Sequence, residues 1–263
     1  MAVKMQEIMT VLETLAPVAL AEDWDNVGLI LGRKTTDVSK VLMALDATDE
    51  IVEEAIREGC QAIITHHPPI FKPITRVNDD NARGIRFLEL IERGIAVYAC
   101  HTNLDSCDGG INDMLCDILE LKNAENVYES KPGVFSARAG NLQQEMTLAE
   151  FANYVKNRLN LSLANYVGDC DAKVRKVGVL GGAGADMKFF RSMLKAGCDT
   201  FVTSDIRYMP AIQAQDLGLN LVEATHYGSE IIFGDGLKKY LNQHLPNLEV
   251  IVSKVDGQPF KGV

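Results

Sequence analysis

Residues 55–65 read Ala55-Ile-Arg-Glu-Gly-Cys-Gln-Ala-Ile-Ile-Thr65, and residues 193–203 read Met193-Leu-Lys-Ala-Gly-Cys-Asp-Thr-Phe-Val-Thr203. The two stretches align without a gap, share Gly-Cys and the final threonine, and keep the same apolar positions. Each pattern is typical of a helix end, a glycine that closes the helix and a buried strand. This internal repeat predicts that the chain contains two copies of one α/β unit.

The repeat extends outward on both sides of this stretch. Residues 40–45 match residues 176–181 upstream, and residues 94–99 match residues 218–223 downstream. Short runs rich in β-branched residues alternate with helical periodicity, which predicts an α/β fold with a mostly parallel or mixed sheet. The predicted strands are 41–45, 62–65, 95–99, 134–139, 163–167, 176–180, 200–203, 219–223 and 248–252, and the predicted helices are 8–15, 51–58, 85–93, 111–119, 148–159, 187–196, 211–217 and 231–240.

The expected domain boundaries follow the repeat. We expect residues 1–125 to form the first α/β repeat and residues 126–225 the second. Residues 226–263 then form a C-terminal segment that carries ligands and packs back on the first repeat. Residues 125–145 contain Pro132-Gly133 and one short strand-like run, so we expect a junction there.

Composition limits the function classes. The chain has 263 residues, 47% of them hydrophobic, and a net charge of -10, so it lacks the basic footprint of a nucleic-acid binder and an anionic membrane would repel it. It shows no secretory signal and no apolar run approaching ~18 residues. Six cysteines without CxxC spacing fit reduced core residues, and we expect a cytoplasmic protein with no membrane or nucleic-acid partner.

Chemically reactive side chains follow the strands of both repeats. The first repeat has His66-His67 after a strand, where the second has Ser204-Asp205. After the next strand, the first repeat has His101-Thr-Asn-Leu-Asp105 and the second has His226-Tyr-Gly-Ser-Glu230, both of the form His-x-x-x-carboxylate. In open α/β sheets functional groups gather at the carboxyl ends of strands, so four of the five histidines stand where a site is expected.

This donor set predicts a metal site. If a helix begins after each strand, a histidine and a carboxylate four residues apart lie on one face and can reach one ion. Five or six such donors favour two divalent ions that share a bridging carboxylate. Imidazole and carboxylate suit Zn, Fe, Mn, Co or Ni. The predicted ligands are His66, His67, Asp105, His226 and Glu230, with His101 ranked behind them as an inward residue.

Other interpretations stand beside the metal site. The His66-His67-Pro-Pro stretch could be a turn, Asp105 could cap a helix, and Glu230 could be a solvated first-turn carboxylate. Gly181-Gly-Ala-Gly184 could dock an anion on its amides, although tight packing explains the glycines at least as well. His244 has no partner in the pattern, and we expect it on the surface.

The residues also resemble a known family, the dinuclear-metal-centre hexameric proteins catalogued as GTP cyclohydrolase 1 type 2 homologues and called NGG-interacting-factor-three-like. The likeness covers nearly the whole chain. It rests on Trp24-Asp-Asn-Val-Gly-Leu29, Ala44-Leu-Asp-Ala-Thr48, Thr65-His-His-Pro-Pro69, His101-Thr-Asn-Leu-Asp105, Gly181-Gly-Ala-Gly184, Thr203-Ser-Asp-Ile-Arg-Tyr208 and His226-Tyr-Gly-Ser-Glu230.

The resemblance implies two interlocked, duplicated α/β units with the metal site between them, and subunits that form a toroidal homohexamer. By the resemblance, one ion takes His67, Asp105 and Glu230, and its neighbour takes His66 and His226 with Glu230 as the bridge. The chain departs from the family at Ser204 and Met209, which puts substrate contacts of that segment in doubt. It also lacks the long central insertion of some members, so no accessory domain is expected near residue 130.

The favoured expectation for function is a metal-dependent hydrolase, related to the GTP cyclohydrolase 1 type 2 homologues, that acts through a metal-bridging hydroxide on a nucleotide-like or other small substrate. Asp205, Asp46 and His101 are the candidate proton carriers. The alternatives are a metal carrier or insertion protein and a ligand-binding or interaction scaffold without turnover. Reversible metal loading without turnover favours the carrier, and metal that leaves only when the oligomer dissociates favours the scaffold.

Overall fold

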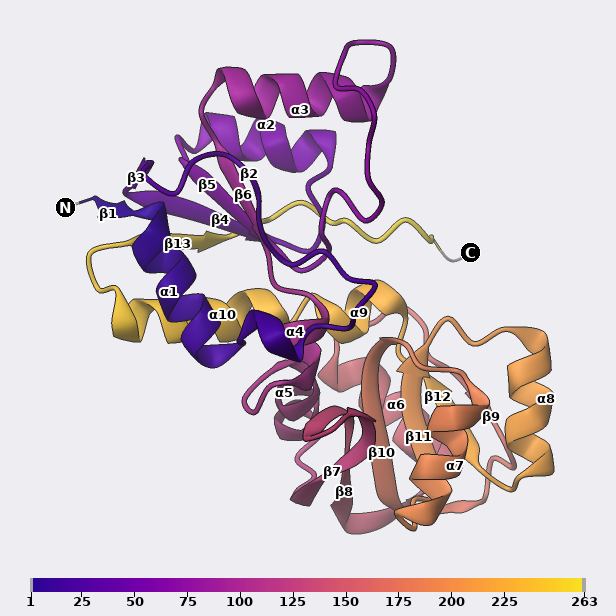
Figure 1. Cartoon of the computed structure of the whole chain (residues 1–263). Coiled ribbons are helices and arrows are strands. Elements are labelled where there is room, and N and C mark those ends of the chain that lie inside the picture. Colours follow the sequence, from indigo (N-terminus) through magenta and orange to yellow (C-terminus); the bar gives the residue numbers. More distant parts are fainter. Residues whose placement is uncertain (1, 262–263) are drawn as a thin grey trace. The chain divides into compact units, whose positions relative to one another are not determined.

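A computed structural model describes residues 2–261, which fold into two compact units (Figure 1). The first unit contains residues 2–104 together with Phe233–Gly257. The second contains Asp105–Ile232 together with residues 258–261. Each unit is a mixed α/β structure, which confirms the predicted fold class. The repeat boundaries at residues 125 and 225 remain a prediction, because they concern duplication of sequence, whereas these units are defined by packing.

The first unit is built on a five-stranded sheet with the order β13-β4-β5-β6-β2. Four of its strands run parallel, and β2 pairs with β6 in the antiparallel sense. The strands are β2 (Gly28–Leu31), β4 (Lys40–Ala44), β5 (Ala62–Thr65), β6 (Ala96–Ala99) and β13 (Glu249–Val252). The first unit also has a two-stranded sheet of β1 (Val3–Lys4) and β3 (Asp37–Val38) and a 3-10 turn, η1 (Val18–Leu20). Its helices are α1 (Met5–Leu15), α2 (Asp49–Arg57), α3 (Ala82–Glu92) and α10 (Phe233–His244).

The second unit has a six-stranded sheet with the order β7-β8-β10-β11-β12-β9. Its three central strands run parallel, and β8 and β9 flank them in the antiparallel sense. The strands are β7 (Lys122–Lys131), β8 (Val134–Thr147), β9 (Asn165–Val167), β10 (Lys173–Ala183), β11 (Thr200–Ser204) and β12 (Asn220–Glu223). The helices are α5 (Ile111–Ile118), α6 (Leu148–Arg158), α7 (Met187–Lys195), α8 (Tyr208–Asp216) and α9 (His226–Glu230), while α4 (Thr102–Ser106) begins in the first unit and ends in the second.

The two sheets share one arrangement, β4-β5-β6-β2 in the first unit and β10-β11-β12-β9 in the second, each with a last strand of reversed direction. β5 and β11 are buried along their whole length, as expected of central strands covered on both faces. Gly59 and Gly197 end the preceding helices with φ of +69° and +79°. Only glycine adopts this conformation without strain, which explains why both copies keep it.

Three local predictions were incomplete. Residues 125–145 are no loose junction, because β7 and β8 form a long hairpin around Gly133, and the predicted strand 134–139 is only the start of β8. The extra length of β8 depends on its pairing with β10, a distant strand that no local pattern reveals. Strand β2 was not predicted, and α8 begins three residues before position 211, since proline is tolerated in a first turn. Among residues 2–261, no helix has the length and apolarity needed to cross a bilayer.

Candidate metal centre

Three imidazoles of the first unit meet at the carboxyl ends of neighbouring strands. Strand β5 ends at Thr65 and β6 ends at Ala99, and these two residues are partners in the parallel ladder. His66 therefore follows β5 at the same sheet edge where His101 follows β6. A ring nitrogen of His66, one of His67 and one of His101 lie within 4.8 Å of one another. His101 therefore belongs to the same histidine group as His66 and His67, although the sequence pattern placed it below the five predicted ligands.

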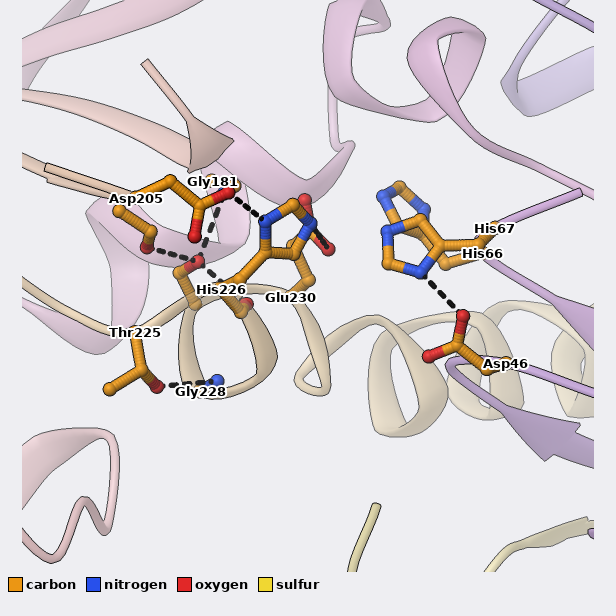
Figure 2. Close-up of polar contacts among 12 residues, drawn as sticks. Asp46, His66, His67, Gly181, Asp205, Thr225, His226, Gly228 and Glu230 are labelled. Carbon is orange, nitrogen blue, oxygen red and sulfur yellow. Dashed lines mark hydrogen bonds and ion pairs between the residues drawn. The ribbon is translucent and has the colours of Figure 1, made fainter. Parts of the chain in front are cut away.

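Each of these rings is held through its Nδ1 atom. His66 Nδ1 lies 2.8 Å from the Cys100 carbonyl oxygen. His67 Nδ1 lies 2.9 Å from Asp46 Oδ1 (Figure 2). His101 Nδ1 lies 2.9 Å from Asp25 Oδ1. An acceptor on Nδ1 selects the tautomer with the proton there and leaves the Nε2 lone pair to bind a metal, as is usual for metal-ligating histidines.

Asp25 fixes His101 and the first turn of α4. Its side chain is fully buried and also accepts hydrogen bonds from the backbone N–H and the hydroxyl of Thr102, at 3.1 Å and 2.5 Å. Burial alone raises the pKa of this carboxyl, but the hydrogen bond and charge of His101 and the hydrogen bonds from Thr102 lower the pKa to about 2. Asp25 is therefore ionised at neutral pH.

In the second unit, α9 carries an imidazole between two carboxylates. His226 Nε2 lies 3.0 Å from Glu230 Oε2, one helical turn away, and His226 Nδ1 lies 2.9 Å from Asp205 Oδ2 (Figure 2). The helix begins because the Thr225 hydroxyl caps it by accepting from the Gly228 N–H. The hydrogen bond to Glu230 raises the pKa of His226 to about 9, against the opposing effect of burial and with further help from Asp205.

Asp205 is itself held in place by Glu223. The N–H groups of Asp205 and Ile206 donate to the two carboxylate oxygens of Glu223 at 3.1 Å and 3.0 Å. Asp205 has φ of 56° and Thr225 has φ of 54°, a conformation that costs a residue other than glycine roughly 1–2 kcal/mol. Strain of this kind persists where surrounding contacts enforce it. Here it occurs in the residue that precedes His226 and in the residue that contacts the His226 ring.

The glycine turn at the end of β10 makes room for Glu230. A Cβ atom at Gly182, where φ is +67°, would lie 2.2 Å from Glu230 Oε1. The amides of Gly181, Gly182 and Gly184 donate to side-chain oxygens of Asn112, Ser229 and Thr203. Of the two interpretations of this turn, the structure supports close packing, because these amides are already bonded within the protein.

The predicted match between His101 and His226 is wrong by one residue. Strands β6 and β12 end at the equivalent residues Ala99 and Glu223, so His101 corresponds to Thr225. His226 is the first residue of α9, whereas His101 precedes α4 and bonds to Asp25. The one-turn contact between imidazole and carboxylate is therefore seen in α9. Asp105 lies in α4, where its carbonyl oxygen accepts from Asn112 Nδ2 at 3.0 Å.

No sequence pattern points to the residues that hold the imidazoles and the glycine turn, among them Asp25, Asn112, Glu223 and Ser229. Asn112 and Ser229 are buried polar side chains, and Ser229 Oγ also lies 3.1 Å from Ser204 Oγ. Such residues lack a local signal, because their partners are far along the chain. His244 is exposed in α10, as predicted.

Comparison with known proteins gives a consistent result. The profile of the Duf34/NIF3 family (NGG1p interacting factor 3) matches residues 3–259. The chain is 33% identical over 268 residues to a GTP cyclohydrolase 1 type 2 homolog of Clostridium acetobutylicum, with 99% of each chain covered. It is 34% identical over 266 residues to the protein of that name from Clostridium perfringens, covering 98% of this chain and 99% of the relative. The crystal structure of a Bacillus cereus protein related to NIF3 superposes with a TM-score of 0.92 at 28% identity, over 100% and 99% of the two chains.

Proposed function

The chain belongs to the Duf34/NIF3 family, and on that premise we propose that it is a metal-dependent hydrolase with two divalent ions as cofactors. The proposed ligands are His66, His67, Asp105, His226 and Glu230. One observation carries the proposal: a ring nitrogen of His66, one of His67 and one of His101 lie within 4.8 Å of one another, and each ring is held through Nδ1 by a carboxylate or carbonyl oxygen. The convergence is what supports a metal site, because a hydrogen bond at Nδ1 alone is also made by the exposed His244, to the Tyr240 carbonyl oxygen.

The donors fit divalent first-row metals. The first unit contributes imidazole nitrogens of His66 and His67. The second contributes His226 Nε2 and, 3.0 Å from it, Glu230 Oε2. Nitrogen and oxygen donors of this kind suit Zn, Fe, Mn, Co or Ni. Two ions bound by these residues would supply Lewis-acid chemistry, activating a water near neutral pH and polarising a substrate oxygen, which is what a hydrolase requires.

The carboxylates behind the imidazoles divide into two roles in this proposal. Asp46 and Asp205 orient His67 and His226 and increase their basicity as ligands. His101 is the proton carrier in this proposal, because the ionised Asp25 orients its ring through Nδ1 and a ring nitrogen of His101 lies within 4.8 Å of those of His66 and His67. Changing Asp25 should therefore lower turnover without removing metal.

The test is the double variant His226→Ala with Glu230→Ala. We expect it to lose bound metal and to lose hydrolysis of nucleotides or model phosphoesters in the presence of Mn or Zn. His244→Ala is the matched control, since that histidine is exposed in α10 and plays no part in the proposal. Unchanged turnover in the double variant would exclude the mechanism. Reversible loading of the native protein without turnover on any such substrate would favour the metal carrier.

On the family resemblance we also propose that the subunits form a homohexamer. Exposed apolar side chains such as Tyr208 (76% exposed) and Met209 (59% exposed) in α8 supply surface that a second subunit could cover. Sedimentation of the native protein measures the assembly. A monomer at micromolar concentration contradicts it.

A further inference from the structure

The carboxylate of Glu223, the last residue of β12, is bonded to the backbone of a neighbouring turn. The parallel ladder pairs Thr203 with Glu223, so the chain that leaves β11 passes beside this side chain. Oε1 accepts the Asp205 N–H at 3.1 Å, and Oε2 accepts the Ile206 N–H at 3.0 Å. Burial raises the pKa of the Glu223 carboxyl, and hydrogen bonds from the backbone of Ile206, Asp205 and Thr225 oppose that rise. Both oxygens are therefore engaged by the backbone.

The two turns beside Glu223 carry the two partners of the hydrogen bond between Asp205 and His226. Asp205, with φ of 56°, lies in the turn after β11. Thr225, with φ of 54°, is the N-cap of α9, which begins at His226. A residue other than glycine leaves this conformation unless contacts hold it there. The carboxylate of Glu223 supplies such contacts to the backbone of both turns.

The first repeat shows that the sheet itself does not need a carboxylate at this position. Strand β6 ends at Ala99, which pairs with Thr65 as Glu223 pairs with Thr203. Ala99 is fully buried, and its methyl group accepts no hydrogen bond. Removing a carboxylate from water costs free energy, which an alanine avoids. Glu223 therefore serves a need of the second repeat that the first repeat does not have.

That need follows from how weakly Asp205 is otherwise held. Its Oδ2 lies 2.9 Å from His226 Nδ1, yet the Asp205 side chain is 52% exposed. In the first repeat, Asp46 bonds to His67 Nδ1 from a backbone without positive φ. If the turn after β11 relaxed, the Asp205 carboxylate could exchange the imidazole for water. The hydrogen bonds to Glu223 oppose that relaxation.

We propose that Glu223 is a positioning residue for His226 and acts through the turn of Asp205. By fixing this turn, Glu223 keeps Asp205 Oδ2 bonded to the Nδ1 proton of His226. His226 Nε2 is then held in its place 3.0 Å from Glu230 Oε2. The consequence for metal binding rests on the proposed function, whereas the orientation of the imidazole can be measured in metal-free protein.

The first test observes the imidazole by nuclear magnetic resonance. Metal-free protein is labelled with isotope-enriched histidine, and the Nδ1–H signal of His226 is the one that His226→Ala removes. A hydrogen bond to a carboxylate shifts such a proton downfield and slows its exchange with water. Glu223→Gln keeps the size of the side chain but turns an NH2 group, which cannot accept, toward a backbone N–H. We expect its His226 signal to move upfield and to exchange faster, toward the values in Asp205→Gly.

The second test is a double-mutant cycle on metal affinity. Asp205→Gly removes the carboxylate, and glycine adopts φ of 56° without strain. Asp205→Gly should lower metal affinity by about 10-fold to 100-fold, and Glu223→Gln should lower it by no more than this. The double variant should bind metal as Asp205→Gly does, because a residue that acts only through Asp205 then has nothing left to position.

Glu54→Gln is the matched control in the first unit. Glu54, in α2, is 4% exposed and accepts hydrogen bonds from the Ser253 hydroxyl and from the Lys254 N–H at 3.1 Å. Its replacement should lower the melting temperature, as loss of a buried acceptor does, and leave the His226 signal and metal affinity unchanged. An equal change of the His226 signal in Glu54→Gln and Glu223→Gln would mean that general loss of stability is responsible.

Two further results would overturn the role of Glu223. One is a His226 signal in Glu223→Gln that equals the native signal. The other is a double variant in which the two losses of metal affinity multiply. If the native protein binds no metal, the hydrolase proposal fails, yet the signal of metal-free protein still decides whether Glu223 positions His226. A negative result for Glu223 leaves the test with His226→Ala and Glu230→Ala unaffected.

Discussion

The two repeats end their equivalent central strands with different chemistry. Strand β5 is followed by His66 and His67, whereas β11 ends in Ser204 and is followed by Asp205. In the first unit the imidazoles stand directly at the strand end. In the second unit the strand end has the hydroxyl of Ser204 and the carboxylate of Asp205, and the imidazole belongs to His226, the first residue of α9.

The difference shows that two copies of one fold can carry different donor groups at equivalent strand ends. Both copies keep the order and direction of the strands, yet one presents nitrogen donors and the other an imidazole with carboxylates. One feature is common to both: a carboxylate 2.9 Å from Nδ1 orients the imidazole, Asp46 at His67 and Asp205 at His226. We infer that orientation is preserved while the type of donor diverges.

The largest expected effect comes from filling the space beside Glu230. Gly182→Ala places a methyl group 2.2 Å from Glu230 Oε1 and should displace that carboxylate, lowering metal affinity by about 100-fold or more, since displacing a ligand exceeds the cost of altering its support. Metal titration of chelator-treated protein measures this. Gly197→Ala is the control, because its φ of +79° carries the same backbone penalty with no atom within 4 Å. Equal loss of metal in the control would refute the steric explanation.

The next effect tests whether the two supporting carboxylates are equivalent. Asp46→Asn and Asp205→Asn each remove the charge behind one imidazole and should each lower metal affinity about 10-fold to 100-fold. The measurement is a metal titration of each variant beside the native protein. If one variant binds metal as the native protein does, the carboxylate at Nδ1 does not support metal binding in both units, and the comparison fails.

A smaller effect is expected from pH in the second unit. The pKa of His226 is raised to about 9, so below this pH a proton occupies the imidazole and competes with metal. Apparent affinity should fall by up to about tenfold for each unit of pH below 9 and level off above it. In metal-free protein the raised pKa stabilises the fold fully below about 6.5, and this stability is lost as pH rises through about 9.

Titration of metal binding and of the melting temperature against pH checks both statements. Glu230→Gln removes the main cause of the raised pKa, so its melting temperature should depend less on pH in this range. An unchanged profile in this variant would show that another group is responsible.

The smallest difference between the repeats should be in the thiol reactivity of the equivalent cysteines Cys60 and Cys198, which we expect to be equally low. Both are under 5% exposed, and burial raises their pKa to about 11 and about 12. Neither should react with a thiol reagent in the native protein, whereas the exposed Cys170 should react first. Mass spectrometry of the labelled protein identifies the site. Labelling of Cys60 alone would mean that the first repeat opens locally where the second does not.

Part of this molecule could be predicted because its signals are local. Strands and helices can be recognised from hydrophobic periods of two and 3.6 residues. The ends of α2 and α7 can be recognised from the glycine that follows each, because glycine readily adopts a positive φ. The fold class, the repeat and the position of the histidines at strand ends follow from such patterns. Each depends on neighbours within a few residues.

The tertiary structure decided the rest. Asp25 meets His101 from 76 positions away, and Asn112 meets Gly181 from 69 positions away. The same holds for the long hairpin of β7 and β8, which depends on β10, and for the one-residue offset between α4 and α9. A sequence records which side chains can accept a hydrogen bond. Which acceptor reaches which imidazole depends on how distant strands pair, because that pairing alone sets the distance between them.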